Sequence, residues 1–372
     1  MTGHAARRAV LILSASMGAG HDAAAAELAR RLCARGVDAE VADVLDLLPL
    51  RLGAALRGGY GWMMRSAPWA YELIYRAFFV PRGGPGGVSP MTALVAVRLL
   101  RLLRRRRPDE VVSAFHLAAQ AAGHLRARGL LPVPSTVLLT DFAAHRLWLH
   151  PGNDRYLCPD PASARAVRAA TGRPAHAHAP LVRPEFLEHP AAAPGDGVTR
   201  TVLVSAGAWG VGGVERTARI LARSGRYAPV VLCGRNDELR RRLARRLGRS
   251  ATALGWCADM PGLLAGAYAL VDNAAGLTCR EAMASGVPVV SFLPIPGHGR
   301  DGALAMARAG LSVYARDAGE LLAALDRIGT PGGRERHAAA AAALFAAAPA
   351  ESFFTPVVPS GLPGGSAATG PA

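Results

Sequence analysis

Lysine is absent from this 372-residue sequence, so arginine carries all of its positive charge apart from histidine. Together with the abundance of alanine, glycine and proline, this indicates a compositional bias of the genome rather than a functional signal. The charge balance still has physical consequences. A net charge of +16 favours acidic partners such as nucleotide phosphates, anionic lipid headgroups or nucleic acid.

Cysteine is also scarce, and its spacing excludes the usual C-x-x-C metal and redox motifs. Because most of the cysteines lie in apolar segments, we expect them to be reduced and packed, as in a cytoplasmic protein. They are Cys33, Cys158, Cys233, Cys257 and Cys279.

Long apolar runs are missing as well. No run reaches the roughly 20 residues that a membrane-spanning helix needs, and no secretory signal precedes the first expected strand. We therefore expect a cytoplasmic protein, peripheral on the inner face of the plasma membrane. The chain also contains no Asp-x-Asp motif, so we expect no metal in its site and no cofactor.

The chain contains two similar α/β segments, and its length favours two domains. An apolar strand at 9–14 leads into a glycine-rich loop and a helix, and the pattern restarts with a strand at 201–205. We predict an N-terminal Rossmann-like domain over 1–188 and a second one over 201–348. A polar linker over 189–200 joins them, and a disordered tail follows over 349–372.

The first glycine-rich loop allows several interpretations. Gly18, Gly20 and Ala23 satisfy the loose dinucleotide pattern G-x-G-x-x-G/A, which would indicate a nicotinamide enzyme. Asp38, Glu40 and Asp43 lie near the position of the acid that would bind the ribose. The same glycines also suit a tight turn with close helix packing. His21 lies at the expected helix N-terminus, which lowers the pKa of an imidazole and favours its neutral, proton-accepting form.

A second motif lies in the stretch 272–302. Thr278 and Glu281 fit the Ser/Thr-x-x-Glu signature of a helix start, and Gly286 ends that helix. A buried strand over 287–293 follows, with a loop at its carboxyl end. Ligands bind at that end of open α/β sheets, and a helix N-terminus beside it suits a phosphate.

Aromatic residues and arginines alternate over 59–80, which fits two structures. Such a segment is typical of an interfacial membrane helix, and equally of a core helix with a solvated face. Nucleic acid is not expected as a partner, because no recognised reader motif accompanies the charge.

Several segments resemble one glycosyltransferase family, which includes the monogalactosyldiacylglycerol synthases and the N-acetylglucosamine transferase of peptidoglycan synthesis. The resemblance covers nearly all of 9–325, and it rests on the order and spacing of several short motifs. These motifs are SMGAGH (16–21), TDF (140–142), CP (158–159), CGRN (233–236), GW (255–256) and LTCREAMASGVPVV (277–290).

The resemblance implies a GT-B fold, in which two Rossmann-like domains with parallel sheets face a cleft. It further implies inverting transfer of a hexose or N-acetylhexosamine from a UDP-sugar to a lipid hydroxyl, of a diacylglycerol-like or polyprenyl-linked acceptor. UDP-sugar, the lipid acceptor and an anionic membrane surface are then the expected partners. The implied catalytic base is His21 or Asp141, and Glu281 would hold the ribose hydroxyls.

The remaining implied site residues fall into two groups. Those for the donor are Gly207, Gly210, Gly212, Arg235, Gly255, Trp256, Gly276, Leu277, Thr278, His298 and Asp301. Those for the acceptor side of the cleft are Gly18, Gly20, His116 and His145.

One loop departs from the family pattern. The chain has Pro-Gly-His-Gly at 296–299 where the family has Pro-Gly-Gln-Glu, whose last two residues contact the sugar. Asp301 is a candidate replacement. Because of this departure, the sequence does not determine the donor sugar. Two alternative functions also stay open: a UDP-sugar or lipid binding protein of the same fold with lost or altered catalysis, and a UDP-sugar epimerase.

Overall fold

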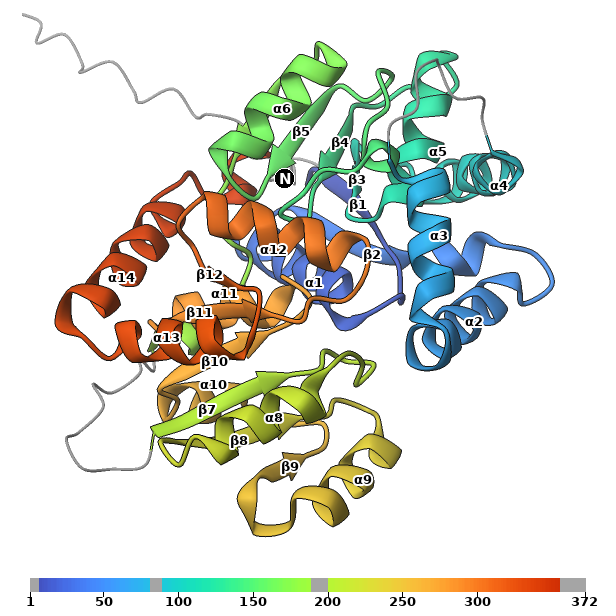
Figure 1. Cartoon of the computed structure of the whole chain (residues 1–372). Coiled ribbons are helices and arrows are strands. Elements are labelled where there is room, and N and C mark those ends of the chain that lie inside the picture. Colours follow the sequence, from blue (N-terminus) through green and yellow to red (C-terminus); the bar gives the residue numbers. More distant parts are fainter. Residues whose placement is uncertain (1–6, 81–88, 189–199, 355–372) are drawn as a thin grey trace, which may run out of the picture.

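The computed structural model describes residues 7–80, 89–188 and 200–354, which form two α/β halves stacked one above the other (Figure 1). The predicted linker lies outside the described residues except for Arg200, which begins the first strand of the second half.

The first half is built on a six-stranded parallel sheet in the order β2-β1-β3-β4-β5-β6. Its strands are β1 (Ala9–Ser14), β2 (Asp38–Asp43), β3 (Glu110–Ser113), β4 (Ser135–Leu138), β5 (Arg155–Cys158) and β6 (Ala175–Ala177). Its helices are α1 (Ala19–Ala34), α2 (Leu52–Ser66), α3 (Pro68–Phe78), α4 (Pro90–Arg106), α5 (His116–Ala127), α6 (Pro161–Thr171) and α7 (Glu185–Glu188), with 3-10 turns η1 (Val44–Leu47) and η2 (Arg146–Trp148).

Both faces of this sheet are covered, as its continuous apolar strands require. Side chains alternate along β1, so Val10 and Ile12 pack with α1, while Leu11 and Leu13 pack with α4 and α5 on the other face.

The second half repeats the plan with the parallel order β12-β11-β10-β7-β8-β9. Its strands are β7 (Arg200–Ser205), β8 (Tyr227–Leu232), β9 (Thr252–Leu254), β10 (Ala269–Asp272), β11 (Val289–Phe292) and β12 (Val313–Ala315). Its helices are α8 (Val214–Arg223), α9 (Asp237–Leu247), α10 (Met260–Ala265), α11 (Leu277–Ala284), α12 (His298–Arg308), α13 (Ala318–Ile328) and α14 (Pro331–Phe345), with 3-10 turns η3 (Gly248–Ser250) and η4 (Ala350–Phe353).

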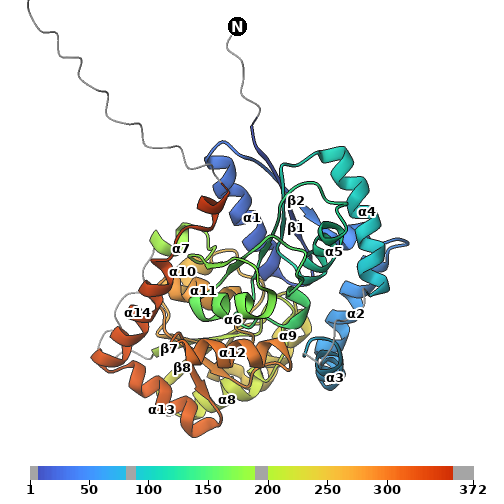
Figure 2. The same ribbon diagram turned by 90° about the horizontal axis from the view of Figure 1, so that it is seen from above.

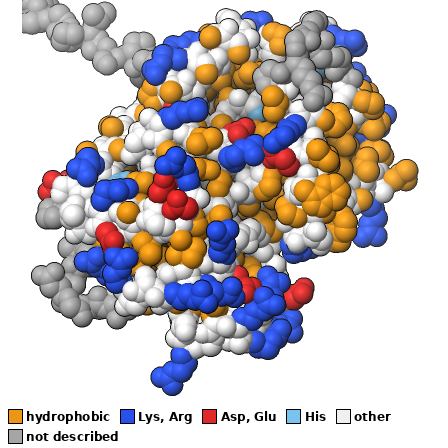
Figure 3. Space-filling model, viewed as in Figure 1, with side chains coloured by type: hydrophobic (Ala, Val, Ile, Leu, Met, Phe, Trp, Pro, Cys, Tyr) orange, Lys and Arg blue, Asp and Glu red, His pale blue; other side chains and the backbone are white. Residues whose placement is uncertain are grey.

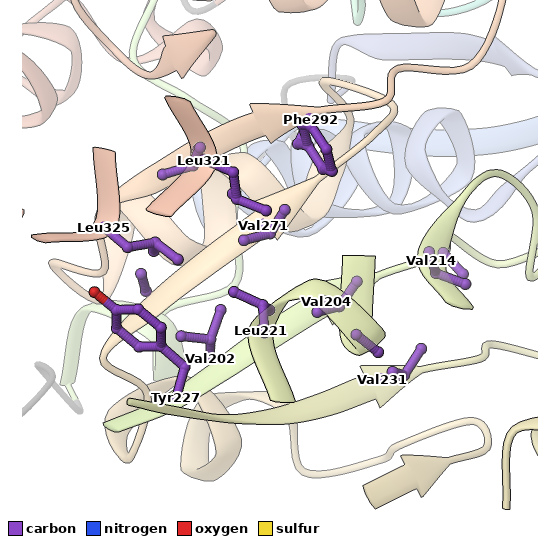
Figure 4. Packing of buried hydrophobic residues seen from close by; sticks show 14 of the residues in the cluster. Val202, Val204, Val214, Leu221, Tyr227, Val231, Val271, Phe292, Leu321 and Leu325 are labelled. Carbon is purple, nitrogen blue, oxygen red and sulfur yellow. The ribbon is translucent and has the colours of Figure 1, made fainter. Parts of the chain in front are cut away.

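Figure 4 shows the core on one face of this second sheet. Val202 and Val204 of β7 and Val271 of β10 contact Leu221 of α8 and Leu321 of α13. The opposite face is covered by α11 and α14. The carboxyl ends of both sheets are thereby directed toward the space between the halves.

The aromatic segment 59–80 forms two helices, α2 and α3, which meet at Ala67 because Pro68 begins the second one. Met64, Tyr71 and Tyr75 are buried against Ile295 of the second half. The other side of both helices is exposed. The core-helix interpretation is confirmed for the buried face, whereas the interfacial-helix interpretation of the exposed face stays a prediction.

Two predictions about the ends of elements are wrong. Gly276, rather than Thr278, is the residue before the first turn of α11, so Thr278 and Glu281 do not form a capping box. The predicted disordered tail begins too early. The chain returns to the first half at η4, which packs on α1 with Phe354 fully buried (Figure 2). The tail over 355–372 lies outside the described residues.

The cysteines are all free: Cys158, Cys233 and Cys279 are buried, Cys257 is half-buried and Cys33 is exposed. The prediction of packed cysteines is therefore wrong for Cys33. Among the described residues, no helix is both long enough and apolar enough to cross a bilayer.

Candidate active site

A cavity of about 1870 Å³ lies between the two halves and is lined by both. Residues just after the carboxyl ends of the parallel strands form much of its wall, as expected for an open α/β sheet. The first half contributes the loop after β1 and the residues after β4. The second half contributes the loops after β7 and β10 and the start of α11.

His21 lies in the first turn of α1 and borders this cavity. Its Nδ1 is 2.6 Å from the hydroxyl oxygen of Thr140, and the edge of its ring faces Phe115 at 5.1 Å between centroids. Burial lowers the pKa of His21 and outweighs the opposing effect of the nearby Asp141 carboxylate. The imidazole is therefore neutral at pH 7 and able to accept a proton.

Asp141 follows β4 and faces the same space. The indole N–H of Trp148 donates to its Oδ2 at 2.8 Å, and His145 Nε2 lies 3.7 Å from that oxygen. Burial would raise the pKa of Asp141, but the neighbouring histidines and the Trp148 hydrogen bond together lower it to about 2. Such a carboxylate is a weak base at neutral pH, whereas the neutral imidazole of His21 is able to accept a proton.

His116 and His145 form an aromatic wall beside Asp141. Their ring centroids are 5.3 Å apart, and the Phe79 centroid lies 4.8 Å from that of His145. Burial lowers the pKa of both imidazoles, to about 4 for His145. Both are neutral at pH 7 and give this part of the cavity an uncharged surface.

Arg280 crosses from the second half to the first. It is 6% exposed, its Nη2 donates to the carbonyl oxygen of Thr140, and its guanidinium lies 4.7 Å from the centroid of the Phe142 ring. Burial lowers its pKa, yet a guanidinium remains charged in a protein. A buried cation from α11 thus stabilises the segment that contains Asp141.

The start of α11 forms the opposite wall of the cavity. No side chain of the described residues caps this helix, so its first N–H groups are available to an anion. Glu281 faces the cavity from the second turn, and burial raises its pKa to about 7 despite the charge of Arg183. Trp256 also lines the cavity, with the Arg235 guanidinium 4.2 Å from its ring centroid.

Comparison with known proteins matches residues 21–175 to the family described as "Monogalactosyldiacylglycerol (MGDG) synthase". Processive diacylglycerol beta-glucosyltransferases are also similar. The protein from Bacillus cereus (strain ATCC 14579) is 28% identical over 240 residues, and that from Bacillus mycoides (strain KBAB4) is 27% identical over 240 residues. Each match spans 61% of this chain and only 61% of the relative's length.

Solved structures resemble nearly the whole chain. MurG from Acinetobacter baumannii has a TM-score of 0.57 at 16% identity, covering 93% of this chain and 97% of that one. The spinosyn rhamnosyltransferase SpnG, complexed with spinosyn aglycone, has a TM-score of 0.61 at 17% identity, covering 93% and 98%. Two parallel sheets that face a shared cavity are also the arrangement that the GT-B fold predicts. The chain has the GT-B fold.

Most of the predicted site residues line the cavity of this GT-B protein. They are Gly18, Gly20, His21, His116, Asp141, His145, Gly207, Gly255, Trp256, Gly276, Leu277, Thr278, Glu281 and His298. Residues from segments far apart in the chain are thereby brought together, although their individual roles stay predictions.

Four predicted donor residues do not line it: Gly210, Gly212, Arg235 and Asp301. Gly210 and Gly212 both have positive φ, a backbone conformation that favours glycine, and neither position leaves room for a side chain. A Cβ would lie 2.4 Å from Asn236 at the first and 2.2 Å from Asn273 at the second. Asp301 is absent from the cavity lining, and its carboxylate accepts the hydroxyl of Tyr75 at 2.9 Å, so its role as a replacement sugar contact stays a prediction.

The dinucleotide interpretation of the first loop is not supported by its surroundings. Asp43, an acid at the position expected for ribose, instead accepts from the Ser16 hydroxyl at 2.5 Å and caps the turn at Leu45. Glu40 pairs with Arg106 at 3.0 Å. Both carboxylates therefore have structural partners.

Sequence reasoning did not identify several residues that shape the site. Arg280 could have been recognised from the sequence, because it is an arginine among small and apolar residues in the first turns of α11. For Tyr71 and Tyr75, only their helical spacing pointed to a shared face. No sequence pattern indicated the role of Trp209, whose indole N–H donates to the Met17 carbonyl at 3.0 Å and joins the two glycine-rich loops.

Proposed function

We propose that this protein is an inverting glycosyltransferase that moves a hexose or N-acetylhexosamine from a UDP-sugar to a lipid hydroxyl. The observation that carries the proposal is one cavity that combines three parts. It has an uncapped helix N-terminus with Glu281 on one side, a neutral His21 on the other, and an apolar wall from α2 and α3. The similarity to diacylglycerol beta-glucosyltransferases supports a diacylglycerol-like acceptor, with a polyprenyl-linked lipid as the other candidate.

The donor would bind along the second half. The diphosphate would lie at the N-terminus of α11, where free N–H groups and the helix dipole stabilise negative charge. The Glu281 carboxylate can accept hydrogen bonds from both ribose hydroxyls, and the uracil would lie near Gly255 and Trp256. Because the helix supplies this stabilisation, we propose transfer without a metal ion.

The chemical step would use His21. The acceptor oxygen attacks the anomeric carbon as the bond from that carbon to the phosphate oxygen of UDP breaks, and UDP leaves with the bonding electrons. The hydroxyl proton passes to His21, whose imidazolium is stabilised by the Asp141 carboxylate. By analogy with glycoside hydrolysis, the sugar passes through an oxocarbenium-like state with inversion.

The acceptor would arrive from an anionic membrane surface docked on α2, α3 and α4, at the cytoplasmic face of the membrane. Figure 3 shows hydrophobic side chains gathered over this side of the molecule. Trp62, Trp69 and Phe78 are more than half exposed, and Trp62 and Phe78 also line the cavity. The apolar surface is therefore continuous with the site. Arg65 of α2 and Arg101 of α4 are exposed and would attract anionic headgroups.

The decisive experiment is UDP calorimetry in the presence of EDTA on the wild type and on Glu281→Ala. We expect micromolar binding to the wild type and at least tenfold weaker binding to the variant, because one carboxylate would contact two ribose hydroxyls. Binding that is absent, or indifferent to Glu281, would contradict the donor site. Binding that requires a divalent ion would contradict the metal-free mechanism.

A second stage tests transfer. UDP-hexoses are supplied to the wild type and to His21→Ala with dioleoylglycerol in vesicles that contain or lack phosphatidylglycerol. We expect the anionic vesicles to give faster transfer, and His21→Ala to keep UDP affinity while losing about 100-fold or more in kcat. Full activity of His21→Ala would rule out this residue as the base.

A further inference from the structure

Helix α3 of the first half holds a segment of the second half, residues 296–301, through side chains one turn apart. The Tyr71 hydroxyl is 2.7 Å from His298 Nδ1, and the Tyr75 hydroxyl donates to Asp301 Oδ2 at 2.9 Å. Both tyrosines are almost fully buried, at 6% and 2% exposure. These contacts join parts of the chain that are more than 220 residues apart.

Glu72, between the two tyrosines, completes the connection. Its Oε2 accepts the backbone N–H of Gly297 at 2.9 Å, and its Oε1 accepts from Arg300 at 3.0 Å. Gly297 has a φ of 70°, and a Cβ there would lie 2.7 Å from the Tyr75 ring. The backbone of the segment therefore lies flat against the tyrosines in a conformation that favours glycine.

The segment fixed in this way ends in the cavity. His298 begins α12 and lines the wall toward Asp141 and His21, with which it interacts electrostatically. Its Nδ1 is taken by Tyr71, so the other ring nitrogen is left to a ligand in the cavity. A sugar attached to UDP at α11 would lie between that nitrogen and the Asp141 side.

We propose that Tyr71, Glu72 and Tyr75 are positioning residues for the donor sugar. They fix the 296–301 segment so that His298 presents one imidazole nitrogen to a sugar hydroxyl. The inference rests on the proposed UDP-sugar donor and deepens it. The missing Gln/Glu pair of this loop is compensated from the other half of the molecule, so recognition of the sugar requires the two halves to be in contact.

The test compares UDP with a UDP-hexose by calorimetry, without lipid, on the full-length chain. The UDP-hexose is whichever of UDP-glucose, UDP-galactose and UDP-N-acetylglucosamine the wild type binds most tightly. The variants are Tyr71→Phe, Tyr75→Phe and Glu72→Gln, which keep shape and remove only a hydroxyl or a charge. We expect UDP-hexose affinity to fall fivefold or more while UDP affinity stays within twofold, since the lost contacts lie at the sugar end.

Leu73→Ala is the matched control. Leu73 lies on the same helix and is 60% exposed, so both affinities should stay as in the wild type. Unchanged UDP-hexose affinity in all three variants would overturn the inference. So would an equal loss for UDP and UDP-hexose, which would indicate a general structural role. Failure of the wild type to bind UDP would instead refute the proposed function.

Discussion

At the scale of single residues, burial sets the protonation states in the cavity. His21 was the first candidate for the base and Asp141 the second, and both lie near the carboxyl ends of strands of the same sheet. Burial makes His21 neutral, whereas the histidines and Trp148 around Asp141 keep it ionised. These surroundings favour the imidazole as the proton acceptor of the proposed transfer.

Glu281 leads to a pH prediction. Burial raises the pKa of this carboxyl to about 7, and in the proposed donor complex the ribose hydroxyls would donate to its ionised form. UDP affinity should therefore rise as the pH increases through 7 and level off above pH 8. Between pH 8 and pH 6 we expect a loss of up to about tenfold, since the ionised fraction falls by that factor.

Calorimetry at several pH values checks this on the wild type and on Glu281→Gln. The terminal phosphate of UDP titrates near pH 6 in both proteins, so the Gln variant serves as the control. An identical pH dependence in the two proteins would assign the effect to the nucleotide alone.

At the scale of elements, α2 contacts the second half through a position that only glycine can occupy. A Cβ on Gly61 would lie 2.6 Å from the Trp209 ring, whereas a Cβ on Gly58 of the same helix meets nothing within 4 Å. We expect Gly61→Ala to lower the free energy of unfolding by about 1–3 kcal/mol through overpacking. Gly58→Ala should raise it by up to about 1 kcal/mol, because alanine favours a helix.

Urea unfolding followed by circular dichroism measures both changes. Equal stabilisation by the two substitutions would mean that α2 moves freely from Trp209. In that case the contact between the halves at this point would be loose.

At the scale of the whole molecule, the chain crosses back to its first half after α14. Phe354 is fully buried beside α1, with the Arg155 guanidinium 4.9 Å from its ring centroid, and its carbonyl accepts from Arg8 at 2.6 Å. The last described residues thus complete the core of the first half and are bonded to Arg8, which directly precedes β1.

Replacing this side chain tests that role. Phe354→Ala should cost about 3–5 kcal/mol of unfolding free energy, as for other buried aromatic residues. Phe353→Ala, at a half-buried neighbour, should cost clearly less. Similar small losses in both variants, measured by chemical unfolding, would show that the returning segment contributes little to the core.

Local patterns predicted much of the fold. The strand at 9–14 was predicted with its observed bounds, and the two glycine-rich turns followed their strands as expected. The predictions failed where local signals were weak. The start of α12 at His298 was taken for a loop because prolines and glycines precede it, and the three-residue strand β6 is too short to give a pattern.

The sequence by itself determined the two α/β halves, their glycine-rich first turns, and the placement of His21, Asp141 and Glu281 next to strand or helix ends. Each of these depends on neighbouring residues and on the periodicity of strands and helices. Only the tertiary structure decided that Arg280 reaches Thr140, and that α3 holds the 296–301 segment. Such contacts depend on how the two halves sit against each other, and no local pattern encodes a separation of more than a hundred residues.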